Sequence, residues 1–147
     1  MKKTKVVIAS LLKPIDDTRM FEKFGLSLAE TSQYEVNIIG FDSKNIKSTK
    51  DIVFHPIKPF DRLSFDRLFK PVSIYKNYIK VNPKIIIINT HDLLIVTCLY
   101  KILFGCIIVY DIRENYAKNI QSTAVFPALL RPFIAAWVRL KEWSARP

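Results

Sequence analysis

Residues 84–111 read KIIIINTHDLLIVTCLYKILFGCIIVYD, and this stretch decides the fold class. Four consecutive isoleucines predict a strand from Lys84 to Asn89. Leu93 to Phe104 predicts an apolar helix that ends at Gly105, and Cys106 to Asp111 predicts a second strand. Strands that are apolar on both faces are typical of parallel sheets covered by helices on both sides. The stretch therefore predicts a strand–helix–strand unit of an α/β fold.

The chain outside this stretch continues the alternation of strands and helices. Three more strands are expected, at Lys5 to Ser10, Tyr34 to Phe41 and Ile52 to His55. A helix is expected after Asp16 and Asp17, which can cap its first turn. With 147 residues, 50% of them hydrophobic, the chain fits one domain, residues 1–147. The predicted fold is a Rossmann-like, doubly wound, mostly parallel sheet of about five or more strands with helices on both faces.

Two further segments have a helical pattern. Asp61 to Val81 contains Pro71, so we expect a break near Lys70 and a second helix that begins at Pro71. Phe126 to Trp143 is an apolar helix that carries two tryptophans. Neither segment resembles a linker, and the chain has no internal repeat.

Composition narrows the class of protein. An aromatic content of 12% excludes a disordered chain. Lys101 and Gly105 interrupt the apolar run from Leu93 to Val109, which argues against a membrane span. The two cysteines, Cys98 and Cys106, lie in apolar runs without metal-ligand spacing, so we interpret them as small buried hydrophobes. The start of the chain lacks a signal-peptide cleavage pattern, and we expect a cytoplasmic protein.

The candidate site lies at the carboxyl ends of the strands, where an open doubly wound sheet binds its ligands. Polar residues follow three of the predicted strands, and we expect them to face one crevice: Lys13, Asp17 and Arg19; Asn89, His91 and Asp92; Asp111, Arg113, Glu114 and Asn115. The turn after the first strand has no glycine, so it lacks the dinucleotide fingerprint. The chain also has no phosphate-binding Walker loop, no nucleophile elbow and no zinc ligand set.

The segments that face this crevice resemble the amino-terminal domain of bacterial family-four retaining glycosyltransferases. The resemblance covers most of the chain: LLKPIDDTRMFEKFGLSLAE at 11–30, YEVNIIGF at 34–41, IIIINTHDLLIV at 85–96 and VYDIRENY at 109–116. The last two segments are the more specific. They are similar to a strand that ends in His and an acidic residue, and to a strand that ends in Asp, an apolar residue, His and Glu.

This resemblance implies a GT-B enzyme with two Rossmann-like domains. The first contributes mainly to the acceptor, a glycan or a lipid-linked molecule, and the second holds the nucleotide-sugar donor. We expect that second domain to lie outside this chain, so that the chain alone is inactive. The family generally needs no metal, and we expect no cofactor. Protein groups instead meet the charge on the departing phosphate.

The resemblance assigns catalytic roles to His91, Asp111 and Arg113. The family has a histidine where this sequence has Arg113, and an arginine cannot act as an acid or base near neutral pH. Arg113 can instead offer a charged fork to phosphate, with Asp111 as the organiser of the loop. An Arg113–Glu114 pair that caps the loop is an equally good structural interpretation. The remaining candidates, Lys13, Asp17, Arg19, Asn89, Asp92, Glu114 and Asn115, are interpreted as substrate-binding.

Several of these residues also have a purely structural interpretation. Asp92 is a good cap for the helix that begins at Leu93, and capping is the preferred interpretation. The positive charge of Arg19 opposes the dipole of its helix, which indicates a nearby carboxylate from a ligand or from Asp16, Asp17 or Glu22. His55, followed by proline, is interpreted as structural.

A net charge of +10 leaves alternatives from other classes. Arginine and lysine among the tryptophans of residues 126–143, together with the basic helix at 62–80, suit peripheral contact with an anionic membrane at its inner face. These apolar faces could equally pack on the sheet or on another domain, which is the preferred interpretation for the helix at 62–80. A nucleic-acid module has only basicity in its favour, since no recognition motif is present. A stand-alone α/β regulatory domain is a third alternative.

Overall fold

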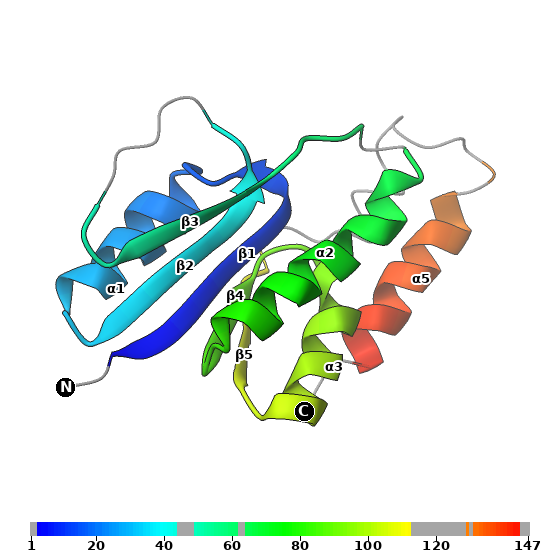
Figure 1. The fold of residues 1–147 in the computed structure, drawn as a ribbon. Helices are drawn as coiled ribbons and strands as arrows, with labels where there is room; N and C mark the ends of the chain where they lie inside the picture. Colours follow the sequence, from blue (N-terminus) through cyan, green and yellow to red (C-terminus); the bar gives the residue numbers. More distant parts are fainter. Residues whose placement is uncertain (1–2, 44–48, 62–63, 113–128, 130, 145–147) are drawn as a thin grey trace.

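The computed structural model describes residues 3–43, 49–61, 64–112, 129 and 131–144. Its centre is a five-stranded sheet, all of whose pairings are parallel, in the order β3-β2-β1-β4-β5 (Figure 1). The strands are β1 (Thr4–Pro14), β2 (Tyr34–Phe41), β3 (Ile52–Ile57), β4 (Ile85–Ile88) and β5 (Ile107–Tyr110). The predicted Rossmann-like α/β fold is confirmed, and every predicted strand is present.

Helices cover both faces of the sheet. On one side lie η1 (Arg19–Leu26), a π-helix, and α1 (Ser27–Glu30), which follows it directly. On the other side lie α2 (Asp66–Val81), the 3-10 turn η2 (His91–Leu93), α3 (Leu94–Phe104) and α5 (Arg131–Ser144). Figure 1 shows α2, α3 and α5 side by side on this second face. No helix within the described ranges is both long and apolar enough to cross a bilayer.

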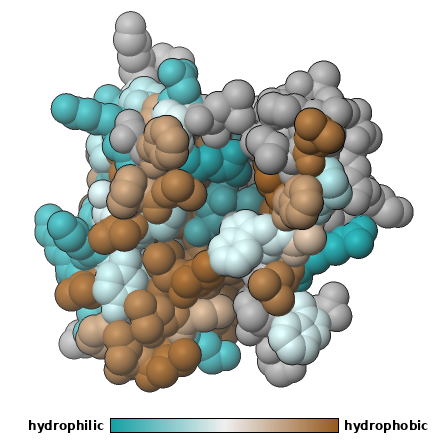
Figure 2. All heavy atoms as spheres, turned by 90° about the vertical axis from the view of Figure 1, so that its right-hand side faces the viewer, coloured by the Kyte–Doolittle hydropathy of each residue, from teal (hydrophilic) through white to brown (hydrophobic). Residues whose placement is uncertain are grey.

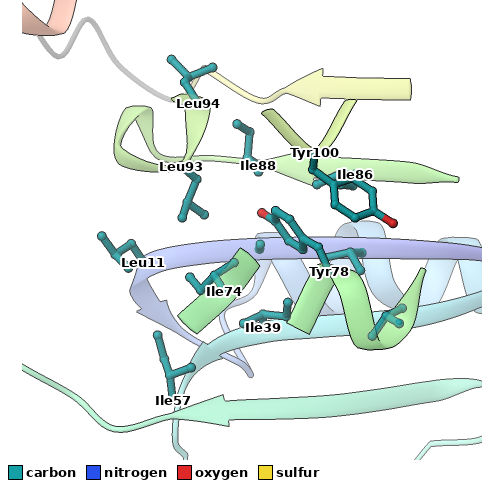
Figure 3. Close-up of a cluster of buried hydrophobic side chains, with 13 residues drawn as sticks. Leu11, Ile39, Ile57, Ile74, Tyr78, Ile86, Ile88, Leu93, Leu94 and Tyr100 are labelled. Carbon is teal, nitrogen blue, oxygen red and sulfur yellow. The ribbon is translucent and has the colours of Figure 1, made fainter. Parts of the chain in front are cut away.

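Two hydrophobic cores form because the side chains of each strand alternate between the faces. Val7, Ala9 and Leu11 of β1 point to the α2–α3 face, where they meet Tyr78 and Tyr100 (Figure 3). The intervening residues of β1 pack with η1 and α1 on the opposite face. Residues 6–11 of β1 are therefore buried on both faces, as expected for a nearly continuous apolar run.

The predicted break in the helix before β4 is wrong. α2 runs without interruption from Asp66 to Val81, with Pro71 inside it. Pro71 lies in the first half of this 16-residue helix. Because proline has no backbone N–H, one helical hydrogen bond is missing there. Pro71 is itself buried, as are Ile74 and Tyr78 one and two turns later. Burial of this common face offsets the local cost and keeps the helix continuous.

The helices α2 and α3 each end at a residue with a positive φ. Asn82 ends α2 with φ 54°, and its N–H donates to the Tyr78 carbonyl at 2.8 Å. Gly105 ends α3 with φ 66°, and its N–H donates to the Lys101 carbonyl at 2.9 Å. The predicted end of the helix at Gly105 is confirmed, because only glycine reaches a positive φ without steric cost.

Strand β1 is longer than predicted. It extends past Ser10 to Pro14, with a shift in its pairing to β2 between Ala9 and Pro14. Gly40 of β2 makes this path feasible, because a Cβ atom there would lie 2.6 Å from the Lys13 carbonyl oxygen. The end of β1 therefore follows β2, on the side of β1 away from β4.

Candidate functional site

The reversal of strand order lies beside β1, which pairs with β2 on one side and β4 on the other. Connections from β1 and β4 leave in opposite directions here, and such a switch point is where open α/β sheets bind ligands. The candidate residues after β1, β4 and β5 belong to this edge of the sheet.

A bidentate ion pair joins the segments that follow β1 and β5. Arg19 Nε donates to Asp111 Oδ2 at 2.8 Å, and Arg19 Nη2 donates to Asp111 Oδ1 at 2.5 Å. The two residues stand 92 positions apart, and β4 lies between their strands. The segments after β1 and β5 therefore meet across the end of β4, as the sequence predicted. The expected carboxylate partner of Arg19 is present, but it is Asp111 rather than Asp16, Asp17 or Glu22.

The π-helix helps to place the guanidinium of Arg19. Lys23 N–H donates to the Thr18 carbonyl at 3.0 Å, an i→i+5 bond that widens the helix. Arg19 lies over the ring of Phe24, five residues later, with 5.7 Å between the guanidinium carbon and the ring centroid. One face of the guanidinium thus rests on an aromatic ring while its fork binds Asp111. π-Helical turns are rare and are frequent at functional sites.

Asp17 is a cap of this helix. Its Oδ1 accepts from the N–H of Arg19 at 3.1 Å and from the N–H of Met20 at 3.2 Å. These two donors would otherwise have no intrahelical partner. The predicted capping role of Asp17 is confirmed, and its role in substrate binding stays a prediction.

The end of β4 is polar and buried. Asn89, Thr90 and His91 are 4%, 5% and 6% exposed, respectively. The Thr90 hydroxyl finds no hydrogen-bond partner among the described residues. Leaving a buried hydroxyl unsatisfied costs on the order of 1–3 kcal/mol, so such groups are worth an explanation where they occur. Three consecutive buried polar residues at the switch point are the strongest local sign of a site.

Asp92 does not cap α3, whose N-cap is Leu93, and no side-chain hydrogen bond forms at that cap position. Its carboxylate binds Arg67 of α2, which donates to Oδ2 from Nη2 at 2.7 Å and from Nε at 3.2 Å. The other oxygen, Oδ1, lies 3.2 Å from Nδ1 of His91. The capping interpretation of Asp92 is therefore corrected: an arginine from another helix takes the carboxylate. Sequence reasoning missed Arg67, because no local pattern marks a contact between α2 and the start of α3.

Four of the predicted site residues have a different outcome. Lys13 is exposed on the part of β1 that follows β2, away from the Arg19–Asp111 pair. Arg113, Glu114 and Asn115 lie outside the described residues, so their roles stay predictions. The structure brings together Arg19 with Asp111, and His91 with Asp92.

Histidine and cysteine side chains elsewhere have ordinary structural surroundings. His55 Nε2 lies 2.8 Å from Asn37 Oδ1, and burial, aided by the charge of Lys80, lowers the pKa of His55. The structural interpretation of His55 agrees with this half-buried contact. Cys98 and Cys106 are free and half-buried, and burial raises the pKa of both thiols. Within the described part of the chain, no three His, Cys, Asp or Glu side chains gather in a way that could hold a metal ion.

Comparison with known proteins identifies the fold. No family model and no curated protein matches the sequence. A solved structure, sucrose-phosphate synthase from Thermosynechococcus elongatus, is similar with a TM-score of 0.63 and 11% sequence identity. The similarity covers 93% of this chain and 39% of that chain, so this chain spans about two fifths of that protein's length. At this identity the comparison shows a shared Rossmann-like α/β fold alone.

Proposed function

We propose that this chain is the acceptor-side, amino-terminal domain of a GT-B glycosyltransferase of the family-four type. The enzyme transfers a sugar from a nucleotide-sugar donor to a glycan or lipid-linked acceptor. The observation that carries the proposal is the Arg19–Asp111 pair, which draws the segments after β1 and β5 together beside the buried end of β4. The fold shared with a sucrose-phosphate synthase and the residues quoted from 85–96 and 109–116 support it.

The proposed chemistry divides between this chain and a second, donor-binding domain. Cleavage of the bond between the sugar and the phosphate leaves negative charge on the nucleotide, and fixed positive groups stabilise that charge. Arg113 is the proposed cation on this chain, and His91 is the proposed hydrogen-bonding partner of the reacting sugars. Asp111 acts as the organiser of the loop, and its bond to Arg19 supports that role. The chain alone is inactive because the donor is held mainly by the other domain.

The residues Asp17, Arg19, Asn89, Asp92, Glu114 and Asn115 are proposed to line the acceptor side. Lys13 is a less central member, because it lies along β2. Arg19 and Asp92 act indirectly, since each already holds a charged partner at 3.2 Å or less. Neither a metal nor an organic cofactor is part of the proposal.

The decisive experiment starts from the gene. The codons after Pro147 are sequenced, and a second Rossmann-like domain with paired glutamates is the expected result. Transfer is then measured with the longer enzyme and a panel of nucleotide-sugars. His91→Ala and Arg113→Ala are expected to lower turnover about 100-fold, as removal of a positioned catalytic group does. Near wild-type rates in both variants would refute the site assignment.

A second proposal concerns location: cytoplasmic, at the inner face of an anionic membrane. Large apolar side chains are exposed on three adjacent helices: Phe65, Leu68, Phe69 and Val72 beside or on α2, Ile95, Leu99 and Ile102 on α3, and Phe133, Trp137 and Trp143 on α5. Figure 2, which faces this side, shows hydrophobic side chains gathered over much of it. On α2, Ile74, Tyr78 and Val81 pack on the sheet, in line with the preferred interpretation of that helix, whereas the exposed residues do not. Such a surface with basic neighbours suits an interface rich in anionic lipid.

Vesicle co-sedimentation tests this location. The chain is expected to sediment with vesicles that contain phosphatidylglycerol, to bind phosphatidylcholine vesicles less, and to dissociate as salt is raised. Absence of binding to both vesicle types would remove the proposal and leave the sugar-transfer proposal intact. Binding to nucleic acid is not expected, and an electrophoretic shift assay at two salt concentrations checks it.

A further inference from the structure

His91 lies at the junction of β4 and the helical turn η2, and its side chain is 8% exposed. A buried imidazole at such a place has two ring nitrogens with different roles. Which nitrogen carries the proton is set by the group that the other elements bring to it. The neighbours of His91 therefore decide how it can act.

Each oxygen of the Asp92 carboxylate lies near a different side chain among the described residues. Oδ2 accepts both hydrogen bonds from Arg67, at 2.7 Å and 3.2 Å. Oδ1 lies 3.2 Å from His91 Nδ1. A carboxylate oxygen this close favours a proton on Nδ1, because its negative charge stabilises an N–H group there relative to a lone pair. Nε2 then carries the lone pair of the neutral ring.

Arg67 makes this arrangement rigid. His91 and Asp92 are consecutive, so both belong to the same short turn and can move together. Arg67 comes from α2, a different element, and it reaches Asp92 across 25 positions of sequence. The side chains of Arg67 and Asp92 are only 20% and 14% exposed, so solvent screens their pairing less than it screens a surface pair. A planar guanidinium also restricts the orientation of the carboxylate it holds.

We propose that Arg67 and Asp92 are positioning residues for His91: Arg67 fixes the Asp92 carboxylate, and that carboxylate keeps the imidazole proton on Nδ1. The significance for sugar transfer rests on the proposed function of His91. The positioning itself does not, since it concerns only groups within this chain. A simple staple between α2 and α3 would be indifferent to which nitrogen carries the proton.

The test is a nitrogen-15 NMR measurement of the two imidazoles in the 147-residue chain. The chain has two histidines, and His55 is an internal reference. Its Nε2 faces the Asn37 amide oxygen, an acceptor only, at 2.8 Å, so the His55 proton belongs on Nε2. At about pH 8, above the ordinary histidine pKa of about 6.5, the two histidines are expected to show opposite proton patterns. His55→Gln assigns the signals.

Three variants complete the experiment. Asp92→Asn is expected to abolish the Nδ1–H pattern of His91 in favour of a mixture, and Arg67→Met is expected to weaken it. Lys70→Met is the matched control, because Lys70 lies on the same helix near the Phe60 ring rather than near Asp92. It should leave His91 unchanged, and the His55 signals should be unchanged in all three, which verifies the fold.

The outcomes separate clearly. A proton on Nε2 of His91 in the wild-type chain would overturn the proposal, as would an Asp92→Asn spectrum identical to wild type. If Asp92→Asn also disturbs His55, the milder Arg67→Lys variant decides, with partial loss of the Nδ1–H pattern as the supporting result and no change as the opposing one. A confirmed pattern beside a transfer rate that is insensitive to His91→Ala would refute the proposed function and leave the positioning intact.

Discussion

Arg19 Nε lies 2.8 Å from Asp111 Oδ2, and this bond ties the segment after the central strand to the segment after the edge strand. Asp111 is the more buried partner, with its side chain 9% exposed against 44% for Arg19. The pair is therefore unequal. Loss of the arginine removes the bidentate partner of a largely buried carboxylate, whereas loss of the carboxylate leaves a guanidinium that water can reach.

The first prediction follows from this inequality. Arg19→Ala is expected to destabilise the fold more than Asp111→Ala, with a coupling free energy on the order of 1 kcal/mol between the two sites. Urea unfolding of the two single variants and the double variant measures it. Lys13→Ala, which removes an exposed lysine of β1 away from the pair, is the control and should change stability by less than about 0.5 kcal/mol. A coupling near zero would mean that the ion pair does not hold the two segments.

The second prediction concerns Gly40. A Cβ atom at this position would lie 2.6 Å from the Lys13 carbonyl oxygen and 3.2 Å from the Ile15 nitrogen. Both are backbone atoms, which cannot change position by a side-chain rotation. Gly40→Ala is expected to cost about 3 kcal/mol, at the upper end for an overpacked site. Gly105→Ala is the comparison, because that position has φ +66° but nothing within 4 Å. Its strain of about 1–2 kcal/mol should be smaller. Equal costs in thermal unfolding would contradict the close approach of β1 and β2.

The third prediction separates two roles of Asp17. As a cap, it accepts from two backbone N–H groups, so Asp17→Ala should cost about 1 kcal/mol of stability. Asp17→Ser keeps a capping oxygen and should restore most of that loss. Chemical denaturation of both variants is the measurement. Serine that fails to restore stability would show that the carboxylate has a role other than capping.

The fourth prediction is a dependence on pH through His55. Burial and Lys80 lower its pKa in the folded chain below the ordinary value of 6.5. Between the lowered value and 6.5 the unfolded chain binds more protons, so stability is full above about pH 6.5 and falls on acidification through this window. His55→Gln should show a shallower loss between about pH 7 and about pH 5. Parallel curves for the two proteins in urea unfolding would refute the role of His55.

The three central strands, β1, β2 and β4, could be predicted from sequence because most of their residues are buried on both faces. Four isoleucines in a row have few alternatives to a central parallel strand, and β2 begins and ends at the predicted residues. Gly105 likewise marks the end of α3, since its backbone conformation excludes most other residues. Such features depend on residues that are adjacent in the sequence.

Long-range pairings were predicted less well. The sequence indicated that Arg19 needs a carboxylate, yet it offered three nearer choices than Asp111. Arg67 had no distinguishing feature within its helix, and Asp92 had the composition of a cap. In each case the outcome depends on which elements pack together. The continuation of α2 through Pro71 has the same cause, because burial of one helix face keeps the backbone helical there. Tertiary burial decided between alternatives that local preference left open.

The π-helix places a demand on chain length. Its i→i+5 bond from Lys23 to Thr18 accommodates an additional residue relative to an ordinary helix. Removal of one residue between Met20 and Phe24 would let an ordinary α-helical turn replace the π-turn, with one residue fewer over the same span. Gly25 would then keep its place against Ile38, and Phe24 would follow Arg19 by four residues in place of five. A single-codon deletion here is thus the change of length that this helix tolerates best, because it removes the additional residue and leaves the faces beyond it in place.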